Sequence, residues 1–91
     1  MKPNPAQAEL RRQYIELRDR NAHEFSEVAK LMLKVYDKQL FTLVKDEDRA
    51  ELTTEYKSQR DSTAQKFREV QEALKLAYEE KYKELEDTNE E

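Results

Sequence analysis

Asp19, His23 and Glu27 are the residues of this 91-residue chain whose types and spacing come nearest to a chemical site. On a helix, a four-residue spacing places them on one face, where an imidazole and two carboxylates could share a metal ion. A charged helix produces such triplets by chance, and the paired Glu-x-x-His motifs of helical metal proteins are missing from the sequence. We therefore predict no metal site and no cofactor.

The groups that nucleophilic or acid–base catalysis needs are scarce. The chain has one His, no Cys and no Gly, so it offers no thiol nucleophile and no glycine-rich loop that brings the backbone close to a phosphate. No Ser/His/Asp arrangement is present, and most carboxylates fall on faces expected to be in water. We therefore predict no catalytic residues and no enzymatic activity.

The five tyrosines could stack on nucleic-acid bases, but tyrosine also suits a half-wet helix interface, where the ring packs and the hydroxyl stays in water. The charge balance favours the second interpretation. Residues 1–45 carry 9 Lys/Arg and 6 Asp/Glu, residues 46–91 carry 8 and 15, and the net charge is −4. Neither half is basic enough for a nucleic-acid footprint, so a nucleic-acid-associated regulator is the less favoured alternative.

The elements that carry these residues are expected to be helices. The two Pro fall within the first five residues and Gly is absent, so nothing breaks a helix and tight hairpin turns are disfavoured. Ala, Glu, Lys, Leu, Arg and Gln dominate, and all favour helices. The sequence predicts an all-α protein. It shows no signal-peptide-like apolar region and no membrane span, so we expect a cytoplasmic protein.

One helix is predicted over residues 5–44, with Asn4 as N-cap and Pro5 at its first position. A stripe of apolar or semi-polar residues recurs along it in steps of four, three and four, an 11-residue repeat. Its members are Leu10, Tyr14, Leu17, Asn21, Phe25, Val28, Met32, Tyr36, Gln39 and Leu43. Because the phase never slips, we expect no break before the turn.

A turn is predicted at about residues 45–48, with Asp46 or Asp48 as the next N-cap, followed by a helix over about 48–86 and an acidic, frayed tail at 87–91. The polar segment 57–66 leaves an alternative, because Ser62 and Gln65 resemble a capping box that would start a third helix. We favour one helix here, since Tyr56 and Phe67 share a face only if the helical phase continues through this segment.

These two helices are predicted to form one domain, a long antiparallel hairpin in which Tyr36 faces Tyr56 and Phe25 faces Phe67. The apolar segment 28–36 then lies opposite the polar segment 57–66, which cannot cover it. With no disulfide available, we expect a homodimer that forms a four-helix bundle. The predicted dimer core consists of Val28, Leu31, Met32, Val35 and Tyr36.

The turn end carries further apolar residues, with Phe41 outside the main stripe. We predict that Leu40, Phe41 and Val44 contact an unidentified protein partner, since exposed apolar patches indicate interaction. The function predicted is a small protein-interaction module, such as an adaptor, inhibitor or chaperone-like hairpin. The main alternative is a self-assembling structural or scaffold protein, whose apolar surface is used in self-association.

Overall fold

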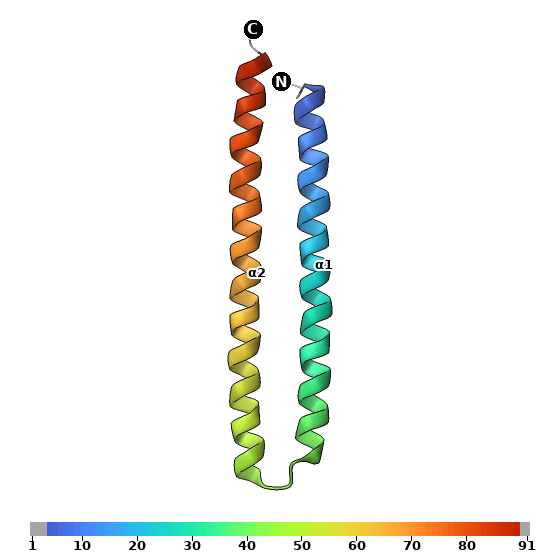
Figure 1. Cartoon of the computed structure of the whole chain (residues 1–91), viewed down its shortest axis with the longest axis vertical. Coiled ribbons are helices and arrows are strands. Elements are labelled where there is room, and N and C mark those ends of the chain that lie inside the picture. Colours follow the sequence, from blue (N-terminus) through green and yellow to red (C-terminus); the bar gives the residue numbers. More distant parts are fainter. Residues whose placement is uncertain (1–3, 90–91) are drawn as a thin grey trace.

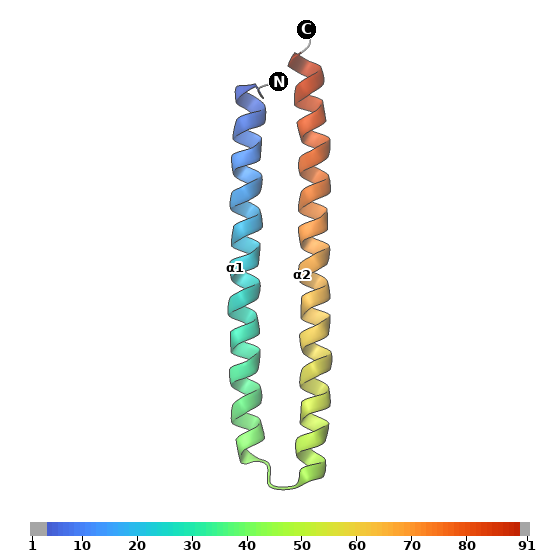
Figure 2. The same cartoon turned by 180° about the vertical axis from the view of Figure 1, so that it is seen from behind.

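The fold is a hairpin of two long helices, described by a computed structural model over residues 4–89, with side chains over residues 4–86. Helix α1 spans Pro5–Thr42 and helix α2 spans Asp46–Asn89. They run antiparallel along the whole length of the molecule, so that the start of α1 lies beside the end of α2 (Figures 1 and 2). The rod measures 71 × 16 × 15 Å. The predicted all-α helical hairpin is therefore confirmed.

A capping box starts α1 where the sequence predicted its first turn. The Asn4 side chain accepts a hydrogen bond from the Gln7 backbone N–H at 2.7 Å, and the Gln7 side chain accepts one from the Asn4 N–H at 3.1 Å. Pro5 occupies the first helical turn, where its missing N–H costs nothing. Asn4 is thus the N-cap, as predicted.

The end of α1 comes earlier than predicted. The helix stops at Thr42, and Leu43 adopts an extended conformation with φ −89° and ψ 133°. The predicted end at about residue 44 thus lies slightly beyond the observed one at Thr42. Helix α2 supplies a cap for this end. Arg49 Nη1 donates to the carbonyl oxygens of Leu40 and Leu43, at 2.8 and 3.1 Å. The Leu40 carbonyl also accepts a hydrogen bond from the Leu43 N–H at 3.2 Å. Together these bonds pair carbonyls at the helix end, and no left-handed residue is needed.

Helix α2 begins at Asp46, earlier than the predicted start at about 48. Asp46, Glu47 and Asp48 therefore lie inside its first turn, where negative charge interacts favourably with the helix dipole. The prediction of Asp46 or Asp48 as N-cap was wrong.

The helix continues without a break through residues 57–66, which confirms the two-helix prediction and removes the three-helix alternative. It also extends to Asn89, past the predicted end at 86; residues 90 and 91 lie outside the described part.

Three aromatic stacks hold the two helices in register. Phe25 stacks on Phe67 with ring centroids 4.5 Å apart, and Tyr36 stacks on Tyr56 at 4.4 Å. Both pairings were predicted. A third stack, Tyr14 on Tyr78 at 4.5 Å, was not. On each helix the stacked residues are eleven positions apart, which is three helical turns, so the rings form a ladder along the seam.

The hairpin has no enclosed core. Among residues 4–86, no apolar side chain is buried, and the one buried residue is Gln7. Two helices cover each other along a single seam, so every seam residue keeps its flanks exposed. Most of the apolar surface that a four-helix bundle would bury remains accessible here.

Candidate protein-interaction surfaces

Three apolar side chains of α1 form an exposed row beside the seam. Val28, Leu31 and Val35 are 46%, 61% and 47% exposed. Their spacing of three and four residues places them on one side of the helix, and we call them the α1 stripe. Each was predicted as dimer core. Each keeps roughly half of its surface exposed beside α2.

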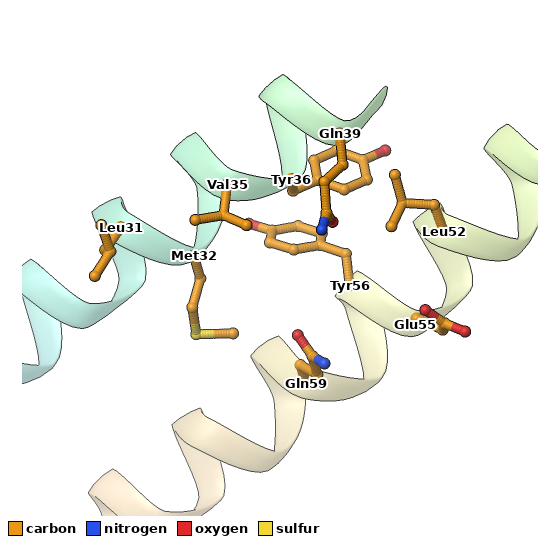
Figure 3. Close-up of a pocket in the computed structure, with 9 residues that line it drawn as sticks. All are labelled: Leu31, Met32, Val35, Tyr36, Gln39, Leu52, Glu55, Tyr56 and Gln59. Atoms are coloured by element: carbon orange, nitrogen blue, oxygen red, sulfur yellow. The ribbon is translucent and has the colours of Figure 1, made fainter. Parts of the chain in front are cut away.

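A groove runs between the α1 stripe and α2 (Figure 3). Its volume is about 410 Å³. The residues that line it come from both helices: Leu31, Met32, Val35, Tyr36, Gln39, Leu52, Glu55, Tyr56 and Gln59. The α1 side of the groove is mainly apolar. The α2 side carries Glu55 and Gln59, so α2 opposes the stripe with polar groups, as the sequence mismatch implied.

Met32 and Tyr36, the other two predicted dimer-core residues, lie in the seam of the hairpin itself. The Tyr36 ring stacks on Tyr56, and the Tyr36 hydroxyl lies 2.7 Å from the Thr53 hydroxyl. The Met32 sulfur accepts a hydrogen bond from the Thr63 hydroxyl at 3.6 Å. Both are half-buried and also line the groove. They therefore connect the two helices, and only part of each side chain is exposed in the groove beside the α1 stripe.

The turn end carries the two most exposed large apolar side chains among residues 4–86. Phe41 is 90% exposed and Val44 is 91% exposed. Phe41 lies in the last turn of α1, and Val44 follows the extended Leu43. We call Phe41 and Val44 the turn tip. Leu40, the third predicted anchor, is half-buried and does not share their exposure.

A second groove, of about 250 Å³, opens on the other side of the seam. Leu33 lines it, about 200° around α1 from Leu31 at the usual 100° per residue. Two cations, Lys30 and Arg60, share its walls. The Arg60 guanidinium lies 5.9 Å from the centre of the Tyr56 ring, a distance that permits a cation–π contact. The two grooves therefore differ in the charged side chains that line them, Glu55 in the first and Lys30 and Arg60 in the second.

The charged residues weighed for chemistry do not converge. Within the described residues no group of three or more His, Cys, Asp or Glu is placed to hold a metal ion. Asp19 pairs with Arg18 at 3.4 Å, and Glu27 pairs with Lys30 at 3.6 Å. The acidic members of the triplet thus take part in exposed ion pairs along their own helix.

One polar group in the seam lacks a partner. The Asn21 side-chain nitrogen is inaccessible to solvent and makes no hydrogen bond within residues 4–86. Asn21 occupies a stripe position of the 11-residue repeat, where most neighbours in the pattern are apolar. A buried amide without a partner lowers stability, so this position is a local weakness of the hairpin.

Sequence reasoning did not name the α2 residues that face the stripe. It placed segment 57–66 opposite segment 28–36, but singled out neither Glu55 nor Gln59. The signal was available, because the pairing of Tyr36 with Tyr56 fixes which α2 residues flank the seam at that level. Likewise, stepping eleven residues back from Phe25 leads to Tyr14 and its stack.

Neither α1 nor α2 carries an apolar stretch of the length needed to cross a bilayer, over the residues described. Comparison with protein-family models, with curated proteins and with solved structures finds no match for this chain. The surfaces described above are therefore the basis for a functional proposal.

Proposed function

We propose that this protein is a small, non-enzymatic interaction module that completes its core by binding another protein, first of all a second copy of itself. The observation that carries the proposal is that no apolar side chain among residues 4–86 is buried. Apolar burial is the main favourable term in folding. Chains of this size that lack disulfides or metals commonly obtain it by oligomerisation, and this chain has no Cys.

The α1 stripe is the surface proposed for the homodimer. When two such hairpins pack through their stripes, the product is a four-helix bundle, in which each helix has two neighbours. Val28, Leu31 and Val35 would lose most of their exposure. The groove beside them would fill with side chains of the second copy.

The turn tip is the surface proposed for a different protein partner. Phe41 lies about 120° around α1 from Val35 at 100° per residue, so packing through the stripe leaves it free. Exposed aromatic side chains are favoured anchors at interfaces. A dimer with a tip at each hairpin turn suits an adaptor, an inhibitor or a chaperone-like protein. The cytoplasmic location expected from the sequence stays a prediction.

Two single variants separate the two surfaces. Leu31→Asp places a carboxylate in the proposed dimer interface, where burying it without a partner is strongly unfavourable. We expect its mass in solution to fall to that of one chain. Phe41→Ser changes only the turn tip, so we expect its mass and melting temperature to stay at the wild-type values. Glu16→Ala, on the solvated face of α1, is the matched control and should change neither.

Capture of host proteins on immobilised wild-type and variant chains then tests the turn tip. Loss of specific bands with Phe41→Ser, at unchanged mass and stability, supports the tip as the partner site. If Phe41→Ser retains every band, the tip is not the site. In that case self-association remains the best-supported role.

A further inference from the structure

Two opposite charges of α2 lie on the same side of the hairpin as the α1 stripe. Glu55 lines the groove together with Leu31 and Val35. Lys66 follows Glu55 by eleven residues, which is three helical turns, so it lies on the same side of α2. Both side chains are exposed, and neither forms an ion pair with another described residue.

The aromatic ladder fixes the level of these charges along the rod. Because Phe25 stacks on Phe67 and Tyr36 on Tyr56, the point midway between Phe25 and Tyr36 on α1 lies level with the point midway between Tyr56 and Phe67 on α2. The positions of the stripe on α1 and of the charge pair on α2 can therefore be compared by measuring each from the reference point on its own helix.

The stripe and the charge pair have a common centre. On α1, the midpoint of Val28 and Val35 lies one residue nearer the turn than the reference point. On α2, the midpoint of Glu55 and Lys66 also lies one residue nearer the turn than its reference point. The two midpoints therefore lie at the same level of the hairpin, on the same side of it.

A two-fold axis at this level, perpendicular to the helices, brings the α1 stripe and the charge pair of one copy opposite those of a second copy. It stacks α1 on α1 and α2 on α2, each pair antiparallel. Val28 of one copy then meets Val35 of the second copy, and Leu31 lies close to its own equivalent. The same rotation places Glu55 opposite Lys66 of the second copy, and Lys66 opposite the second copy's Glu55.

We propose that the partner of the α1 stripe is a second copy of this chain in that antiparallel register, closed by two Glu55–Lys66 ion pairs between the copies. This inference rests on the dimer proposed above and adds its orientation and register. The interface is self-complementary, as two-fold symmetry requires. Charged residues across an interface set its register and exclude wrong arrangements.

The opposite orientation is disfavoured by the same residues. A parallel pair of hairpins would lay the α1 stripe of one copy on the polar segment of α2 of the second, including Glu55 and Gln59. Those polar groups would lose water without gaining partners, which is unfavourable. Only the antiparallel arrangement places apolar side chains on apolar side chains and opposite charges together.

Charge reversal tests the register directly. In a dimer of the Glu55→Lys variant, both pairs between the copies would consist of two cations. In a dimer of the Lys66→Glu variant, both pairs would consist of two carboxylates. We expect each variant alone to self-associate about tenfold more weakly than wild type at low salt. An equimolar mixture of the two variants should form heterodimers at wild-type strength. In the mixed dimer, the lysine introduced at position 55 of one chain faces the glutamate introduced at position 66 of the other. The second pair joins the original Lys66 of the first chain and the original Glu55 of the second. The double variant E55K/K66E should also recover.

Glu80→Lys is the control, because it makes the same charge change at an exposed position on α2 far from the proposed centre. Sedimentation equilibrium gives the association constants, and helical content checks that each chain folds. If Glu55→Lys and Lys66→Glu self-associate as wild type does, or their mixture shows no preference for heterodimers, the register is wrong. If wild type itself stays monomeric, the proposed dimer fails first, and the two failures are distinguishable.

Discussion

Tyr36 and Tyr56 stack with ring centroids 4.4 Å apart, and the Tyr36 hydroxyl lies 2.7 Å from the hydroxyl of Thr53. The Thr53 hydroxyl in turn donates to the backbone oxygen of Arg49 at 2.8 Å. Thr53 therefore uses its proton on Arg49, and Tyr36 is the donor to Thr53. One tyrosine thus connects α1 both to the aromatic ladder and to the first turns of α2.

This arrangement predicts two separable losses at Tyr36. Tyr36→Phe keeps the ring stack and removes the hydroxyl, so we expect a loss of about 1 kcal/mol in the free energy of unfolding. Tyr36→Ala removes the ring as well, and we expect a total loss of about 3 kcal/mol. Urea denaturation followed by helical content measures both. Equal losses in the two variants would show that the stack contributes little.

A second prediction concerns the cap that α2 provides for α1. Arg49→Ala removes two hydrogen bonds to the carbonyls of Leu40 and Leu43, so we expect the free energy of unfolding to fall by about 1–3 kcal/mol. Arg68→Ala is the matched control. Arg68 is exposed and donates to the neighbouring Gln65 side chain, and its removal should cost less than about 0.5 kcal/mol. Similar losses for both arginines would contradict the capping role.

A third prediction concerns the unpaired amide of Asn21. Asn21→Leu removes an inaccessible nitrogen that lacks a hydrogen bond and adds apolar surface to the seam. We expect the free energy of unfolding to rise by about 1–2 kcal/mol. Thermal and urea unfolding of the variant provide the test. A destabilised variant would mean that the amide has a partner in solution, such as an ordered water.

A fourth prediction follows from the ion pair near the start of α1. The Glu9 carboxylate accepts hydrogen bonds from the Arg12 guanidinium, which lowers the pKa of Glu9 below its usual value. A carboxylate whose pKa is lower in the folded state stabilises the fold above its unfolded pKa, and this contribution is lost as the pH falls through the folded pKa. The effect is small, because both side chains are exposed.

Carboxyl titration by NMR checks this pKa directly. In wild type, the Glu9 midpoint should lie below the usual range for glutamate. In Arg12→Gln it should move up, because the main hydrogen-bond donor is gone. An unchanged Glu9 midpoint in Arg12→Gln would show that Arg12 does not interact with Glu9 in solution.

The sequence predicted the pairing of the two helices better than the residues at which each helix begins and ends. The stacks at Phe25 and Tyr36 followed from the helical phase and the position of the turn, because a turn at about residues 45–48 brings Tyr36 opposite Tyr56 and Phe25 opposite Phe67. The continuity of α2 through the polar segment followed from the same phase, since Tyr56 and Phe67 share a face only on an unbroken helix.

The turn was predicted less well, for a physical reason. Leu43 and Val44 continue the apolar content of α1, so the pattern gives no sign that the helix stops at Thr42. The structure places Arg49, which lies on the next element, within hydrogen-bond distance of the carbonyls at this helix end. A hydrogen bond between elements leaves no local pattern in the sequence.

The exposed apolar surfaces were partly predictable. The excess of apolar residues at Val28, Leu31 and Val35 was visible as a mismatch with the opposing segment. The charged α2 residues beside the stripe could not be named, because they depend on the register of α1 against α2 to within one residue. The aromatic ladder in the structure fixes that register.

Sedimentation equilibrium of the unmodified chain, over a concentration range that includes micromolar, tests the central claim most directly. The claim is that the hairpin completes its core with a second copy through the α1 stripe. We predict twice the mass of the chain at micromolar concentration, with dissociation to single chains on dilution. A single-chain mass at every concentration would contradict the claim, because the α1 stripe would then remain in water.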